Sequence, residues 1–352
     1  MSHRFVRRFA PLLLICWPFV STAQESGLAI SGGAPRKTGD ERYEIWANSP
    51  QTRLIVQHNG RPGVMGLTVT WQNLIAGTIL STPEGVVPGS SRDGSDIVSQ
   101  LSVGPGERQS WGLASNVTGH YRFGVIGNTR NQERAQATYG ALSRDMGQRY
   151  VQFALHLGNA VDRGSPRQMD LFREQLRSFG FPSYVLPGVH DLTQQGQRAW
   201  QQRFGGLPLK FRIDRDVFVL LDNSTGYLDA PQRRWLEQTL KAARQGGVRH
   251  LFVFMNRPLV DPRPGINEGM RDRQEVRRLL RLFNDVGVRA VFAGHLPMYT
   301  RDVRQGVTCI TTGGGGDALT LKPSKGGFHH YVLVEVAGPL VSMNPIPLAS
   351  GT

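Results

Sequence analysis

Hydrophobic and polar positions follow two different patterns along this chain of 352 residues. In the first third, short runs of alternating apolar and polar residues are separated by turn sequences such as Asn59-Gly60 and Pro83-Glu84-Gly85. This alternation predicts antiparallel strands joined by tight turns, at 43–46, 53–57, 65–71, 74–80, 97–103 and 109–113. We therefore expect a small β-rich, sandwich-like domain over residues 24–118, with residues 24–40 as a flexible lead-in because they carry no apolar period.

After residue 119 the pattern changes to strands that alternate with helices. Strands are expected at 121–127, 151–158, 183–187, 217–222, 248–255, 288–293, 299–303, 307–312 and 329–336. Helices are expected at 132–146, 167–179, 231–244 and 271–286. Such alternation predicts an α/β domain with crossover helices, here over residues 119–345, followed by a tail at 346–352.

The first 23 residues are typical of a secretory signal peptide. They contain Arg4, Arg7 and Arg8, then an apolar stretch over residues 10–20, then small residues up to Ala23. A transmembrane anchor is the alternative, but the apolar run is about half the roughly 20 residues that a spanning helix needs. We expect cleavage after Ala23, no transmembrane segment afterwards, and an exported protein that is periplasmic or secreted.

The cysteine content and the net charge bear on disulfide formation and on the kind of partner. Removing the signal would leave Cys309 as the remaining cysteine, so no internal disulfide is expected, and its apolar neighbours suggest a buried thiol. The formal charge of +14 falls to about +11 without the three signal arginines. A basic surface favours acidic partners, or simply keeps the protein soluble. No pattern of interleaved aromatic and basic residues argues for specific nucleic-acid binding.

Seven short polar segments follow directly after predicted strands. Since the carboxyl ends of strands in α/β sheets meet at one edge, these segments are expected to form one site. They read Gly127-Asn128-Thr129-Arg130, Gly158-Asn159, Gly188-Val189-His190-Asp191, Leu221-Asp222-Asn223, Asn256-Arg257-Pro258, Gly294-His295-Leu296-Pro297 and 312–316.

Over residues 120–340, this order of segments resembles the calcineurin-like metallophosphoesterase superfamily, whose members read roughly GDxH, GD, GNHD, HxP and GHxH. The resemblance implies an α/β fold and a two-metal site. It also implies which positions would hold ligands, namely Asn128, Arg130, Asn159, Val189, Asn256, His295 and Pro297. Of these only His295 keeps the residue of the family pattern. His190 matches the family's proton donor, with Asp191 beside it to orient it, so both are interpreted as vestigial catalytic residues.

The substitutions argue against a metal pair. Two divalent cations about 3.5–4 Å apart repel by on the order of 20 kcal/mol at an effective dielectric of about 20, and carboxylates must offset that repulsion. Asn128 and Asn159 are neutral, and Arg130 is positive. We expect no metal cofactor. The alternative is one weakly held divalent metal on His295, Asn159, Asn128 and Asn256.

Arg130 and Arg257 are new positive charges among these amides. We interpret them as an anion-binding pair, because a guanidinium can hold a phosphate or carboxylate through two hydrogen bonds. The alternative is that they are exposed or pair with carboxylates elsewhere.

Other polar residues are interpreted as scaffold. The glycine-rich stretch 312–316 could cradle an anion, but a structural turn is favoured. Asp222 is assigned to the scaffold, Asp162 to a loop cap, and His329 and His330 to a strand end.

Three functions follow from these observations. The first is an exported, non-hydrolytic pseudo-phosphatase that binds an anionic small molecule, a phosphorylated envelope component or an envelope partner. The second is an active phosphoesterase with a non-standard or mononuclear site. The third is a structural role in envelope assembly, in which residues 24–118 bind a protein partner.

Overall fold

The computed structural model describes residues 21–23, 27–60, 62–87, 91–93, 95–130, 133–193 and 196–348. The predicted signal peptide lies outside the described residues, except for 21–23. Those three residues form strand β1 (Ser21–Ala23), which pairs antiparallel with β2 (Leu28–Ser31). In the part of the chain that is described, no helix is long and apolar enough to span a membrane.

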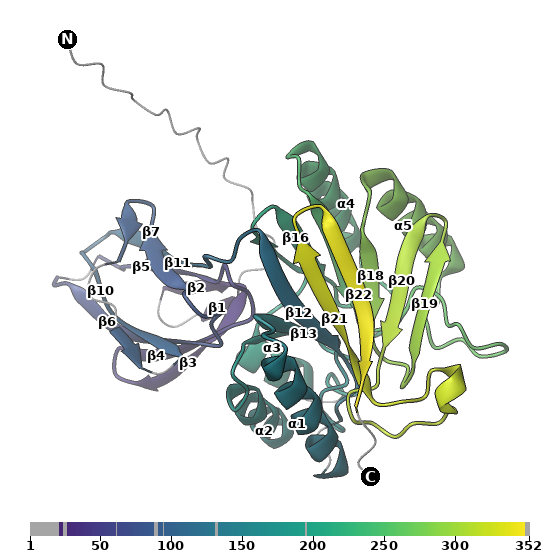
Figure 1. The fold of residues 1–352 in the computed structure, drawn as a ribbon. Coiled ribbons are helices and arrows are strands. Elements are labelled where there is room, and N and C mark those ends of the chain that lie inside the picture. The colour runs from purple at the N-terminus through teal and green to yellow at the C-terminus, as the bar shows by residue number, and fades with distance from the viewer. Residues whose placement is uncertain are drawn as a thin grey trace.

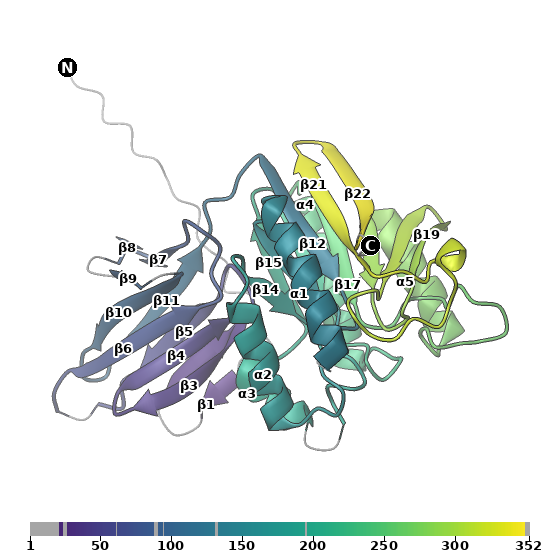
Figure 2. The same cartoon turned by 60° about the horizontal axis from the view of Figure 1, so that its bottom comes forward.

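The first domain consists of two sheets that face each other across an apolar core, as Figure 2 shows. One sheet has the order β1-β2-β5-β11-β7-β8, and the other has the order β3-β4-β6-β10-β9. The remaining strands are β3 (Gly33–Gly39), β4 (Arg42–Ala47), β5 (Arg53–Gln57), β6 (Met65–Gln72), β7 (Ile79–Thr82), β8 (Gly85–Val86), β9 (Ser91–Asp93), β10 (Asp96–Val103) and β11 (Arg108–Ala114). The predicted β-rich, sandwich-like domain is confirmed.

Two predictions in this domain are wrong. The lead-in at 24–40 is not free of regular structure, because β2 and β3 occupy most of its described part. β3 lies at the edge of its sheet, where Pro35 and two glycines are tolerated, and its pairing with β4 outweighs its low strand propensity. The strand expected at 74–80 begins only at Ile79.

The second domain contains two mixed sheets, whereas the alternation of elements predicted one. The first has the order β14-β13-β12-β21-β22, from β12 (His120–Ile126), β13 (Phe153–His156), β14 (Ser183–Val185), β21 (His330–Ala337) and β22 (Leu340–Pro347). The second has the order β15-β16-β17-β18-β20-β19, from β15 (Leu209–Ile213), β16 (Asp216–Leu220), β17 (His250–Met255), β18 (Ala290–Ala293), β19 (Tyr299–Arg304) and β20 (Val307–Thr312). The alternation could not reveal how the strands divide, because the central parallel strands β13, β16, β17 and β18 are buried along their whole length.

Helices cover the outer faces of both sheets (Figure 1). The first sheet packs against α1 (Glu133–Gln148), α2 (Pro166–Arg177) and α3 (Gly196–Phe204). The second sheet packs against α4 (Ala230–Gln245) and α5 (Arg273–Val286). The domain is therefore a four-layer sandwich of helices, sheet, sheet and helices.

Aromatic side chains fill the space between the two sheets. Phe123 of β12 meets Phe218 of β16 edge to face at a centroid distance of 5.2 Å, and Phe254 lies parallel to Phe292 at 5.2 Å. Each fully buried phenylalanine stabilises the fold by roughly 1.5–3 kcal/mol. This rigid core fixes the strand ends that carry the polar segments.

Three elements of this domain were missed. α3 is short and mostly polar, although its buried Ala199, Trp200 and Phe204 keep a helical spacing. β15 alternates buried and more exposed positions. β22 extends to Pro347, so the predicted boundary between the domain and its tail at 345 is wrong. Cys309 is half-buried, whereas its apolar neighbours predicted a buried thiol, and burial raises the pKa of its thiol to about 11.

Candidate functional site

The polar segments converge where the carboxyl ends of the strands in the two sheets lie next to each other. Asn128 follows β12 and Asn159 follows β13 in the first sheet, while Asn256 follows β17 and His295 follows β18 in the second. Hydrogen bonds join the two sides, since the Nδ2 of Asn128 donates to the carbonyl of His295 at 2.8 Å. The structure therefore brings these residues together at one edge of the two sheets.

The backbone at this site has an unusual conformation. Asn128, Arg130, Asn159 and His295 all have positive φ, between 50° and 63°. Left-handed backbone is tolerated by asparagine but costs energy for arginine and histidine, and it gathers at functional sites. Four of the seven ligand positions implied by the resemblance are therefore left-handed, and at Arg130 and His295 this backbone is strained.

The asparagines bond to one another and to the backbone. The Nδ2 of Asn159 lies 3.3 Å from both the Oδ1 of Asn128 and the Nδ1 of His295. The Nδ2 of Asn256 donates to the carbonyl of Leu157 at 2.7 Å. All three asparagines are buried. The Oδ1 atoms of Asn159 and Asn256 are buried with no hydrogen-bond partner in the structure.

Gly188 allows two of these side chains to approach the third strand-end loop. A Cβ atom at this position would lie 2.1 Å from the Oδ1 of Asn159 and 2.7 Å from the Nδ2 of Asn256. The neighbouring Val189 and, across the site, Pro297 are half-buried and offer no side-chain donor or acceptor.

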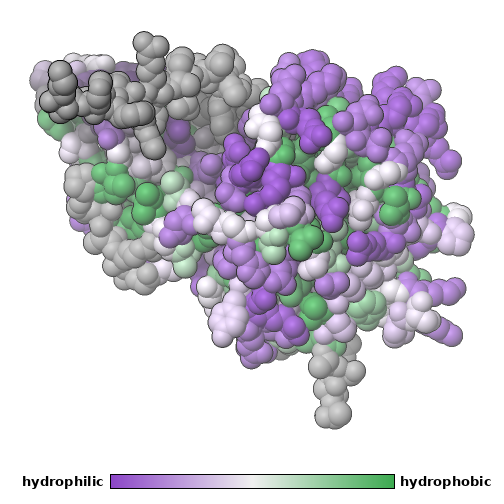
Figure 3. Space-filling view, turned by 45° about the horizontal axis from the view of Figure 1, so that its top comes forward, coloured by the Kyte–Doolittle hydropathy of each residue, from purple (hydrophilic) through white to green (hydrophobic). Residues whose placement is uncertain are grey.

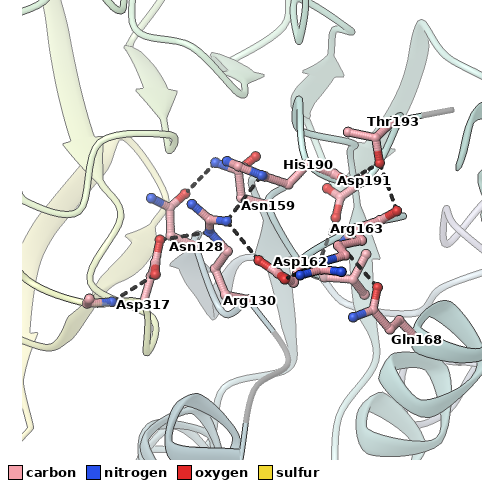
Figure 4. Close-up of polar contacts among 12 residues, drawn as sticks. Asn128, Arg130, Asn159, Asp162, Arg163, Gln168, His190, Asp191, Thr193 and Asp317 are labelled. Carbon is pink, nitrogen blue, oxygen red and sulfur yellow. Dashed lines mark hydrogen bonds and ion pairs between the residues drawn. The ribbon is translucent and has the colours of Figure 1, made fainter. Parts of the chain in front are cut away.

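Arg130 is the centre of a charged network (Figure 4). Its Nε donates to Asp317 at 2.9 Å, and its Nη1 donates to Asp162 at 3.1 Å and to the Nδ1 of His190 at 3.1 Å. The side chains of Arg130, Asp162 and Asp317 are 20–27% exposed. The guanidinium therefore lies at the first ligand segment with two carboxylates as its counter-ions.

This network favours the alternative stated for Arg130, in which the guanidinium pairs with carboxylates. Its charge is already balanced by Asp162 and Asp317, and a phosphate placed there would be repelled by both carboxylates. Arg257 differs, because its Nε and Nη1 donate to the carbonyls of Ser224 and Glu268, and no carboxylate within the described residues forms an ion pair with it. Its predicted role with an anion stays a prediction.

His190 and Asp191 are not arranged as predicted. Asp191 is buried, and its two oxygens accept the N–H groups of Val161 at 2.9 Å and Gly188 at 2.7 Å. Both oxygens are therefore used to hold the loop, not to orient the imidazole of His190. Burial raises the pKa of Asp191 to about 7. Burial, and then the charge of Arg130, lower the pKa of His190, so its neutral form is favoured.

The side chains do not fit a two-metal centre. No group of three or more His, Cys, Asp or Glu residues that could hold a metal ion is found among the described residues. Two ligand positions carry neutral amides where a metal pair needs carboxylates, and a third carries the ion-paired guanidinium of Arg130. Burial lowers the pKa of His295 to about 4, so it is a neutral imidazole at the centre of the amide cluster.

The remaining segments support this site. The Oδ1 of Asn223 accepts the N–H groups of Asn256 and Arg257, so the stretch containing Asp222 is scaffold, as predicted. The glycine-rich stretch packs against the first loop, because the N–H of Gly315 donates to the carbonyl of Gly127 at 3.0 Å. His330 begins β21, as predicted, and His329 contacts the carbonyl of Gly314.

Asp162 and Asp317 are the functional residues that sequence reasoning missed. Asp162 was interpreted as a loop cap, and Asp317 was not considered. Both lie in strand-end loops at the same edge as Arg130, but the sequence did not show which carboxylate the guanidinium would contact.

Comparison with known proteins supports the fold. Residues 130–299 match the family model described as calcineurin-like phosphoesterase. The structure resembles a purple acid phosphatase, PPD1, from yellow lupin (TM-score 0.55, 13% identity, 93% of this chain and 74% of the other). It also resembles a dimetal phosphatase from Danio rerio (TM-score 0.53, 13% identity, 65% of this chain and 97% of the other).

A third similar structure is GAP50, described as the anchor in the inner membrane complex of Plasmodium (TM-score 0.52, 15% identity, 67% of this chain and 87% of the other). No curated protein sequence gives a match. The fold thus has the layers and strand ends of a phosphoesterase. Residues 130–299 belong to a calcineurin-like phosphoesterase domain, which a β-rich domain precedes.

Proposed function

We propose that this protein is an exported, non-hydrolytic member of the calcineurin-like phosphoesterase fold that acts by binding. The observation that carries the proposal is the position of Arg130. A guanidinium, with Asp162 and Asp317 as counter-ions, takes the first ligand segment of the domain. An internal cation of this kind stabilises the loops permanently and leaves no positive centre to activate water.

The electrostatics of the network make a phosphate ester at Arg130 unfavourable. Arg257, which has no carboxylate partner within the described residues, is the group on which an anionic ligand would depend. The basic surface supports binding to an acidic or phosphorylated envelope component. Figure 3 shows hydrophilic side chains over much of one face of the phosphoesterase domain.

Export is supported by the sequence of residues 1–23. An assembly role is compatible with the fold, because GAP50 is described as an anchor, although a likeness at 15% identity concerns the fold alone.

A second candidate is a phosphoesterase with one weakly held divalent metal. The partnerless amide oxygens of Asn159 and Asn256 favour it, together with the contact between the side chain of Asn159 and the imidazole of His295. Three neutral donors bind hard cations weakly, so this candidate requires a high metal concentration.

Turnover of p-nitrophenyl phosphate with added Mn²⁺ tests the proposal. We expect no turnover above the rate with metal alone, both for the natural protein and for His295→Ala. Measurable turnover that disappears in His295→Ala would establish the second candidate instead.

A restored variant is the positive control. It combines Asn128→Asp, Arg130→His, Asn159→Asp, Val189→Asn, Asn256→His and Pro297→His. If the kept backbone is the scaffold of a metal site, calorimetry should detect Mn²⁺ binding to the restored variant and not to the natural protein. Tight binding of two Mn²⁺ ions by the natural protein would contradict the proposal.

A further inference from the structure

A second surface of the phosphoesterase domain is hollowed, away from the polar segments. A groove of about 480 Å³ lies between α5, the loop that follows β17, and the hairpin of β19 and β20. Its floor is apolar and consists of Leu259, Met270, Val276 and Leu280, which are only 2–6% exposed. Such a floor is open to a ligand without any rearrangement of the core.

The rim of the groove exposes large apolar side chains. Val260, Ile266 and Val303 line it and are 36%, 50% and 71% exposed. Single exposed hydrophobic residues are ordinary, but three around one concave surface indicate a contact site.

The rim also carries positive charge. Arg273 and Arg277 lie one turn apart on α5 and both line the groove, and neither forms an ion pair with a carboxylate in the described ranges. Arg304 lines the opposite side and pairs with the half-exposed Asp302. Asp261 lines the groove too, but its carboxylate is already bound to Arg263.

Helix stability does not explain Arg273. It lies in the first turn of α5, where the helix dipole disfavours positive charge. The acidic residue of that turn, Glu275, pairs with Arg233 of α4. Within the described residues, the exposed side chain of Arg273 therefore has no carboxylate that neutralises it.

We propose that this groove binds an acidic, amphipathic peptide segment of a partner protein. Apolar side chains of the segment contact the floor, and its carboxylates pair with Arg273 and Arg277. A flat membrane surface would touch only the rim, because the floor residues are recessed. The inference deepens the proposed binding function by naming a surface and the chemistry of a partner.

Selection of peptides from a random dodecamer display library tests the proposal on the full chain. We expect enriched peptides that combine Asp or Glu with at least one large apolar residue. For a synthesised enriched peptide, the double variant Arg273→Glu/Arg277→Glu should weaken binding by about tenfold or more, because two attractive pairs become repulsive. The matched control is Arg281→Glu, on the same helix but outside the groove lining, and it should leave the affinity within about twofold.

Thermal melting of each variant checks that it folds. If the double variant does not fold, the milder Arg277→Gln replaces it in the affinity measurement. Enrichment of neutral or basic peptides, no enrichment, or equal affinity for the double variant would each overturn the proposal. Binding to phosphatidylglycerol vesicles that is lost in the double variant, without peptide enrichment, would assign the groove to lipid instead. Phosphatase turnover measured on the same preparation reports separately on the proposed function.

Discussion

Arg130 connects four loops of the candidate site through its side chain and the backbone beside it. Its guanidinium contacts Asp162, Asp317 and His190, and its own N–H donates to the carbonyl of Asn159 at 3.0 Å. The sequence identified Arg130 as the unusual residue and predicted its place at the sheet edge. It could not identify the partners, because a guanidinium can face solvent, a ligand or a carboxylate with the same sequence pattern.

Arg130→Met should therefore destabilise the protein. The substitution leaves Asp317 without a counter-ion and Asp162 with only the exposed Arg163, in a partly buried site, which costs about 1–3 kcal/mol of the free energy of unfolding. Urea denaturation measures the change. Arg163→Met is the matched control, because Arg163 also contacts Asp162 but is 85% exposed, and it should change stability by less than about 0.5 kcal/mol. Equal effects of the two substitutions would show that Arg130 is not structural.

The buried side chain of His156 is expected to make the stability of the protein depend on pH. It is fully buried, the N–H of Gly158 donates to its Nδ1 at 3.3 Å, and its Nε2 lies 3.0 Å from the hydroxyl of Thr129. Protonating Nδ1 would place two N–H groups against each other. Burial accordingly lowers the pKa of His156 from 6.5 to about 3.

Because the folded pKa lies below the unfolded one, the unfolded state takes up the proton first. The contribution of His156 to stability should be complete above about pH 6.5 and decrease as the pH falls toward 3, by up to about 1.4 kcal/mol for each unit of pKa shift, while the raised pKa of Asp191 contributes in the opposite direction. Calorimetric melting between pH 4.5 and 7.5 measures the slope. His156→Gln should reduce it. An unchanged slope in His156→Gln would contradict the assignment.

At the scale of elements, the strand ends were more predictable than the sheets. Apolar runs identified where β12, β13, β17 and β18 end, so the sequence placed the asparagines and His295 correctly. Periodicity could not divide the strands between two sheets, since that depends on pairing between segments far apart in the chain. It also missed β3, where the pairing with β4 outweighs local propensity.

The glycine-rich loop after β20 closes the site by close contact with β12. A Cβ atom on Gly315 would lie 2.4 Å from the carbonyl oxygen of Gly127 and 3.0 Å from the Cγ2 of Thr129. Gly315→Ala should therefore separate the two loops and destabilise the protein by roughly 1–3 kcal/mol. Gly147→Ala is the control, because Gly147 lies in α1 with open space around it, and there alanine should stabilise by about 0.5–1 kcal/mol. Chemical denaturation measures the free energy of unfolding of both variants. If Gly315→Ala leaves that free energy unchanged, the loop contact is not needed for stability.

At the scale of the whole molecule, the β-rich domain completes the phosphoesterase domain. β14 is the outer strand of its sheet, so the backbone groups on its outer edge have no neighbouring strand to pair with. Asn48 accepts from the N–H of Val185 at 2.7 Å and donates to its carbonyl at 2.9 Å. Asn73 makes the same pair of contacts with Ser183, at 2.9 Å each. Two side chains of the first domain thus act as a partner strand, an arrangement that neither domain's sequence reveals alone.

The β-rich domain is therefore expected to be required for a soluble fold, whether or not it binds a partner. Asn48→Ala/Asn73→Ala should lower the melting temperature and cause aggregation on mild heating, because the edge of β14 becomes free to pair with other molecules. Light scattering during a thermal ramp measures this, with the exposed Asn344→Ala as the control. If the double variant stays monomeric and as stable as the control, the edge contacts are dispensable. If the double variant aggregates, deleting residues 24–118 would unfold the protein as well as abolish any binding through this domain. A role of this domain in partner binding then has to be tested with substitutions on its outer surface.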